Sequence, residues 1–195
     1  MDFINFYINR WLIPAFLSLA FFLILKYKQH IISRTKSIPY LSLLIKRLRA
    51  DVDDWKATIA APALAAIALN FLLWFVFQQK PASYDEPLWF AALTSGFLNP
   101  IAETFLVQGI LLSALFLLSE HMPIKLHSKI VSIVFVAAIF ALLHTNLDMF
   151  QFTARFSAAL LFNTLYAINR QNLLPPIIAH AGYNWTILAL EIISI

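Results

Sequence analysis

The chain has 195 residues, of which 61% are hydrophobic and only 12% are charged. Soluble domains are about half apolar and about one quarter charged, so this composition excludes an ordinary soluble protein and indicates a lipid environment. The chain has no cysteine, which excludes thiol nucleophiles, cysteine-ligated zinc and disulfides.

Six hydrophobic segments follow one another, and a membrane-crossing helix needs about 20 mostly apolar residues. They lie at residues 11–25, 57–77, 88–118, 130–143, 152–168 and 175–195. The third is too long for one straight span, and we expect Gly96 and Pro100 to interrupt it. We predict an all-α integral membrane bundle of about six transmembrane helices, a single transmembrane domain over residues 1–195. The compact size favours a multi-pass protein of a prokaryotic inner membrane.

The basic residues predict the orientation of this bundle. Eight Lys or Arg residues lie between the first two segments, and others follow the third and fifth segments. In an alternating ladder these loops share one side, which the positive-inside rule makes cytoplasmic. The net charge of +4 therefore indicates contact with the lipid bilayer and its anionic headgroups, and no nucleic acid partner. An amphipathic stretch at residues 38–48 is expected to lie on the inner membrane face.

Three ionisable residues, Glu103, His144 and His180, stand inside the apolar segments, where each costs roughly 2.5 to 3.5 kcal/mol on insertion scales. Asn184 follows His180 by four residues, so both side chains share one helix face. The three ionisable residues lie about 15, 15 and 10 residues from the segment ends at 88, 129 and 170. At 1.5 Å per residue, all three can meet near the middle of the membrane. We therefore predict one polar site where the helices face each other.

These residues stand in three motifs whose order resembles the family of CAAX proteases and bacteriocin-processing enzymes (CPBP, also called Abi). The family carries EExxxR, then FxxxH, then HxxxN. The corresponding stretches here are ETFLVQG at 103–109, FALLH at 140–144 and HAGYN at 180–184. The resemblance covers residues 88–195, the expected catalytic core. It implies an intramembrane endopeptidase that acts on a membrane-anchored peptide or protein substrate.

The first motif departs from the family, because Thr104 replaces the second Glu and Gln108 replaces the Arg. The two positions are four residues apart on one face, so we expect a neutral hydroxyl–amide pair in place of an ion pair. Losing both charges avoids a stranded charge in a low-dielectric interior. Glu103 points about 100° away from Thr104 on the helix, so its role can survive the change.

Peptide hydrolysis needs an activated water, a group that stabilises the oxyanion, and a proton donor for the leaving amine. Glu103 is predicted to be the general base, with His144 orienting the water. His180 and Asn184 would polarise the carbonyl group, as the resemblance also implies. We expect no cofactor. The alternative is a zinc ion held by Glu103, His144 and His180, since one carboxylate and two imidazoles form a known ligand set.

Two functions of other classes stay open. The departures at Thr104 and Gln108 favour a catalytically inactive relative that acts in bacteriocin immunity or as a membrane binding partner. A small transporter would also carry polar groups at mid-membrane, but the sequence has no inverted repeat. Asn70 and Asn163 are expected to hydrogen-bond between helices. His127, in a predicted cytoplasmic loop, is expected to be a surface residue.

Overall fold

The computed structural model describes the chain except residues 1–10, 36, 53, 78–86, 145–147 and 194–195. Over the described residues the secondary structure is helical, apart from one isolated bridge between Arg49 and Asn172. The predicted all-α class is therefore confirmed.

The six predicted segments all form helices, with ends that differ by a few residues. In chain order the elements, with η denoting π-helical turns, are α2 (Ile13–Lys26), α3 (Lys28–Arg34), α4 (Pro39–Arg47), η2 (Lys56–Ala60), α5 (Ala61–Phe77), α6 (Leu88–Leu93), η3 (Thr94–Leu98), α7 (Asn99–Thr104), η4 (Phe105–Leu112), α8 (Ser113–Ser119), α9 (Lys125–Leu143), α10 (Met149–Ile168) and α11 (Leu174–Ile193).

By length and composition, two helices can cross a membrane, namely Lys56–Phe77 and Leu88–Ser119. A third candidate arises if α2 and α3, which meet at an angle of 80°, form one broken span. Among the other helices, His127–Leu143 is apolar but shorter than a span. The protein is thus an α-helical membrane bundle, and six full crossings stay a prediction.

The third segment is one helix of 32 residues, so the expected interruption at Gly96 and Pro100 is wrong. A proline ring inside an α-helix clashes with the carbonyl four residues earlier. Here the turn before Pro100 is π-helical, and the Asn99 N–H bonds to the Thr94 carbonyl, five residues back. The wider turn lets the helix continue through Pro100. We call Leu88–Ser119 the long helix.

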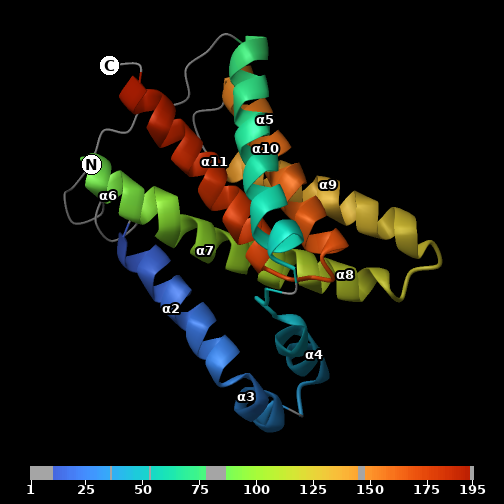
Figure 1. Ribbon diagram of the computed structural model, residues 1–195. Coiled ribbons are helices and arrows are strands. Elements are labelled where there is room, and N and C mark those ends of the chain that lie inside the picture. The colour runs from blue at the N-terminus through green and yellow to red at the C-terminus, as the bar shows by residue number, and fades with distance from the viewer. Residues whose placement is uncertain (1–10, 36, 53, 78–86, 145–147, 194–195) are drawn as a thin grey trace.

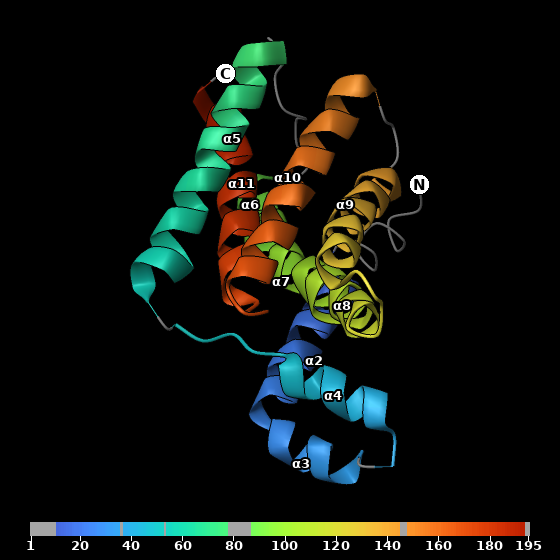
Figure 2. The ribbon, with the colours of Figure 1, turned by 90° about the vertical axis from the view of Figure 1, so that its right-hand side faces the viewer.

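The long helix divides the bundle (Figures 1 and 2). In both views α2, α3 and α4 lie on one side of it, and α5, α9, α10 and α11 lie on the other. Contacts agree, since α2 packs on α7 while α11 packs on η3 and α7, and α9 packs on η4 and α8. Phe105, Leu112 and Phe116 of the long helix are buried in one cluster with Phe21 of α2 and Tyr166 of α10. This packing fixes the long helix relative to both sides.

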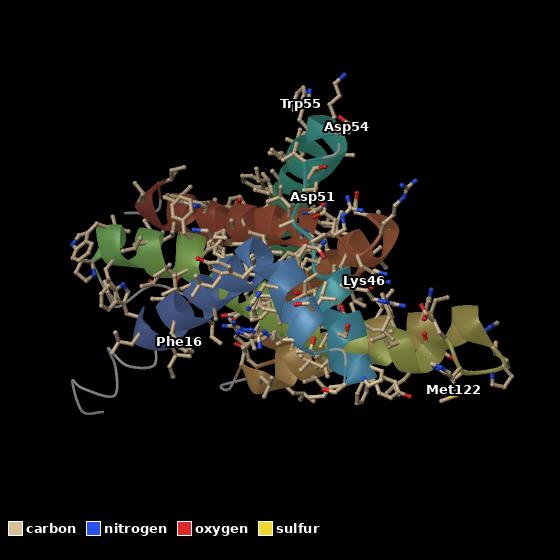
Figure 3. All side chains as sticks on the ribbon, turned by 90° about the horizontal axis from the view of Figure 1, so that it is seen from below. Phe16, Lys46, Asp51, Asp54, Trp55 and Met122 are labelled. Carbon is tan, nitrogen blue, oxygen red and sulfur yellow. The ribbon has the colours of Figure 1, made fainter. Side chains whose placement is uncertain are left out.

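The stretch predicted to be amphipathic forms α4, which Figure 3 views from below with Lys46 labelled. Its Ile45 is buried, while Tyr40 is 65% exposed. Arg47 joins α4 to the end of α8 through a two-point contact with Glu120, at 3.0 and 2.8 Å from Nη2 to the two carboxylate oxygens. Its place on a membrane face stays a prediction.

Candidate active site

Glu103 lies on α7, in the middle of the long helix and between its two π-helical stretches. Its side chain is 33% exposed, whereas the neighbouring Thr104 is fully buried. The two side chains therefore leave the helix in different directions, as the 100° step between neighbours predicts. This orientation directs the Glu103 carboxylate toward the space between α9 and α11.

His144 is the C-cap residue of α9 and directly follows Leu143, the last residue of that helix. Its Nδ1 lies 2.7 Å from the Phe140 carbonyl oxygen. A carbonyl only accepts, so Nδ1–H donates, and in the neutral ring Nε2 then carries the lone pair. That Nε2 is 3.9 Å from Oε2 of Glu103. The backbone of α9 thus sets both the ring orientation and the tautomer of His144.

His180 faces the same carboxylate oxygen from α11, with its Nε2 3.7 Å from Oε2 of Glu103. The ring is buried between two aromatic side chains. Phe162 of α10 stacks on it at a centroid distance of 4.7 Å, and Phe140 of α9 meets it edge-on at 6.0 Å. Since aromatic rings on two helices hold the imidazole, its position relative to Glu103 depends on the packing of α9, α10 and α11.

The structure thus brings Glu103, His144 and His180 together, as the depth argument expected. Both nitrogen–oxygen separations exceed the usual hydrogen-bond limit of about 3.2 Å. They also exceed the roughly 3.3 Å between two ligands on a tetrahedral zinc ion with bonds near 2.0 Å. Among the residues that the structure describes, no three acidic or histidine side chains meet the geometry of a metal site. The carboxylate oxygen therefore lies farther from each imidazole nitrogen than in a formed zinc site.

Asn184 lies one turn after His180 and is half-buried. Its Nδ2 donates to the backbone carbonyl of Ser95, in η3, at 2.6 Å. The amide therefore links α11 to η3, the segment of the long helix directly before the one that carries Glu103. An amide nitrogen carries two donors, and the second N–H of Asn184 has no partner among the described residues, so it can serve a ligand.

The expected pair between Thr104 and Gln108 is wrong. Gln108 Nε2 donates to Oδ1 of Asn163 on α10 at 2.7 Å, and Asn163 Nδ2 donates to the Ile133 carbonyl of α9 at 2.9 Å. The Thr104 hydroxyl makes no hydrogen bond within the described part of the chain. The sequence alone missed this network because it does not show which face of α10 meets the long helix.

The other polar residues behave as expected. Asn70 of α5 donates to the Tyr183 carbonyl of α11 at 2.8 Å, so both predicted interhelical asparagines do bond between helices. His127 is exposed, as predicted. Two further polar groups near the site were not singled out from the sequence. Asn99 lies one turn before Glu103 and has a buried Oδ1 without a partner among the described residues. Arg155 of α10 is half-buried.

Comparison with known protein families identifies the relatives of this site. The family model described as type II CAAX prenyl endopeptidase, Rce1-like, matches residues 85–186, which is just over half of the chain. The chain belongs to the Rce1-like CAAX prenyl endopeptidase family. The match includes Glu103, His144, His180 and Asn184, and it confirms the resemblance to CAAX proteases. No curated protein and no solved structure matches the chain.

Membership in the Rce1-like family supports a protease that works within the membrane. The matched stretch begins just before α6 and ends within α11. It therefore contains the long helix, α9 and α10, the elements that carry or surround the polar cluster. α2, α3, α4 and α5 lie outside it.

Proposed function

We propose that the protein is an intramembrane endopeptidase in which Glu103 activates the hydrolytic water. One observation carries this proposal: a single carboxylate oxygen, Oε2 of Glu103, lies 3.7 and 3.9 Å from Nε2 of His180 and of His144. These gaps are too long for direct hydrogen bonds and leave the facing atoms available to a third polar group. The reacting water is the smallest such group.

The proposed reaction has two proton transfers through the carboxylate. Glu103 takes a proton from water while the Nε2 lone pair of His144 accepts the other O–H and orients it. The hydroxide forms a bond to the peptide carbon, and His180 with the second N–H of Asn184 stabilises the oxyanion. The C–N bond then breaks, and Glu103 returns its proton to the leaving amine.

We propose residues 88–195 as the catalytic core, because all four residues and both aromatic partners of His180 lie there. The substrate proposed from the family description is a prenylated, membrane-anchored peptide or protein. Multi-pass insertion in a prokaryotic cell membrane is part of the same proposal. A metal-free reaction is favoured by the donor separations, and zinc through Glu103, His144 and His180 is the alternative that the experiment decides.

The test uses purified protein in detergent and a panel of labelled lipid-anchored peptides, with cleavage sites read by mass spectrometry. Wild type, Glu103→Gln, His144→Ala and His180→Ala are compared with and without a chelator. We expect each variant to lose about 10²- to 10⁴-fold in rate, the usual contribution of a positioned acid or base. His127→Ala is the matched control, because this histidine is exposed on α9.

Each outcome has a distinct meaning. Cleavage that survives the chelator and is lost in the Glu103 variant supports the glutamate mechanism. Cleavage that is lost with the chelator and restored by zinc would show that the same residues form a metal site. If wild type cleaves no peptide in the panel, the inactive relative, a binding partner in the membrane, becomes the better description.

A further inference from the structure

Arg155 is a cation inside the bundle that the proposed reaction does not use. On α10, Ala159 packs with Ala137 and Phe140 of α9 in one buried cluster. α9 and α10 follow each other in the sequence and run side by side in opposite directions (Figures 1 and 2). His144 lies one turn after Phe140 at the end of α9, and Arg155 lies one turn before Ala159 in α10. Because the two helices are antiparallel, both steps lead in the same direction along the bundle. Arg155 therefore lies at the same height in the bundle as His144 and the candidate site.

The electrostatics agree with this placement. Arg155 is close enough to interact with both Glu103 and His144 through space. It makes no hydrogen bond or ion pair with any residue that the structure describes, and Glu103 directs its Oε2 to the two histidines instead. A half-buried guanidinium has five N–H donors and is always charged, so it is a binding group for an anion.

We propose that Arg155 binds the C-terminal carboxylate of the peptide substrate. The proposal rests on the proposed endopeptidase function. A CAAX sequence is the last four residues of a protein, so a cut within it leaves the free carboxylate at most three residues from the scissile bond. Three extended residues span at most about 10 Å. A guanidinium on the helix beside the reacting groups is well placed for that carboxylate, and the two groups match as a bidentate pair.

This subsite makes the enzyme selective for substrates in which the cleaved bond lies close to a free C-terminus. An internal peptide segment, or a peptide amide, presents no charge to Arg155 and leaves the guanidinium unpaired. The selectivity then comes from a half-buried set of N–H donors that is left without its partner when a ligand lacks the carboxylate. A role in which Arg155 merely acts on the charge of Glu103 would affect every substrate equally, which separates the two ideas.

The experiment compares two lipid-anchored CAAX peptides that differ only in ending as a free acid or as a carboxamide. Cleavage is measured as kcat/KM with wild type, Arg155→Gln and Arg155→Lys. Binding is measured separately by fluorescence anisotropy with Glu103→Gln and with the double variant that adds Arg155→Gln. Arg34→Gln serves as the control for loss of one positive charge, because Arg34 is exposed at the end of α3.

We expect wild type to prefer the acid over the amide by about 10- to 100-fold, the range of a charge-assisted hydrogen-bond pair. Arg155→Gln is expected to bring this ratio close to 1, Arg155→Lys to give an intermediate ratio, and Arg34→Gln to keep the wild-type ratio. The binding ratio should change in the same way.

Two results would overturn the proposal. If wild type cleaves and binds the acid and the amide equally well, the carboxylate subsite is refuted, whereas the proposed protease function is not. A pH–rate profile shifted by Arg155→Gln with an unchanged acid-to-amide ratio would make Arg155 a positioning residue for Glu103. If neither peptide is cleaved, the protease function fails, and the binding ratio still decides whether Arg155 holds a carboxylate.

Discussion

Replacing Gln108 by leucine tests whether its amide link holds the long helix to α10. Gln108 is 2% exposed and Asn163 is 0% exposed. Leucine is close to glutamine in size, so the change leaves no large cavity, but it leaves Oδ1 of Asn163 without its donor at 2.7 Å. An unpaired buried group costs about 1–3 kcal/mol in soluble proteins. Single hydrogen bonds between membrane helices are worth about 0.6 and at most about 1.7 kcal/mol.

We therefore expect Gln108→Leu to lower the free energy of unfolding by about 1–2 kcal/mol. Asn163→Ala should cost more, because it also removes the bond to the Ile133 carbonyl and opens a small cavity. In the double variant the shared bond is lost only once. Its cost should fall short of the sum of the single costs by about 1 kcal/mol, the coupling expected for residues in contact.

The assay is equilibrium unfolding in mixed micelles of increasing SDS fraction, followed by far-UV circular dichroism. The control cycle combines Gln108→Leu with Asn70→Ala, since Asn70 makes its own interhelical bond to Tyr183 and does not touch Gln108. This control pair should be additive within about 0.5 kcal/mol. If the Gln108–Asn163 pair is equally additive, the two amides do not bond and the reasoning is refuted.

Two further predictions concern the end of the long helix and its buried hydroxyl. Thr104→Val should leave stability unchanged or raise it by about 1 kcal/mol in the same unfolding assay, because the buried hydroxyl has no partner among the described residues; a loss would reveal one. The hydrogen bond from Arg47 lowers the pKa of Glu120 below its usual 4.5, so the pair stabilises the fold above that pH and loses this effect as the pH falls. Glu120→Gln should thus cost at most about 1 kcal/mol at pH 7, since the carboxylate is partly exposed, and less below pH 4.5; a constant cost would contradict this.

The helices could be predicted from the sequence because apolar length is the main signal in a membrane protein. All six segments form helices where the hydropathy indicated. The continuity of the long helix could not be predicted in this way. Proline normally marks a break, and the π-helical turn that accommodates Pro100 depends on a backbone register that composition does not report.

The candidate site was predictable in part. Three motifs and a depth argument indicated that Glu103, His144 and His180 meet, and the structure places Nε2 of each histidine within 3.9 Å of Oε2 of Glu103. Their catalytic roles stay predictions. The partners of Gln108 and the location of Arg155 could not be found in the same way, because both depend on which face of α10 turns toward the site. A short-range pattern within one helix carries no information on that rotation.

The π-helical stretch Phe105–Leu112 has a consequence for how related chains are compared. A π turn holds one residue more than an α turn, so deleting one residue here can restore an α-helix without breaking it. Because the π turn absorbs that residue, the two halves of the long helix would keep nearly the same faces after such a deletion. A deletion in an α-helical stretch would instead rotate one half against the other by about 100°, and Glu103 would turn away from the histidines although every motif letter is kept. A one-residue gap opposite residues 105–112 is therefore compatible with the same neighbourhood of the glutamate, whereas a gap opposite an α-helical stretch of the long helix is not.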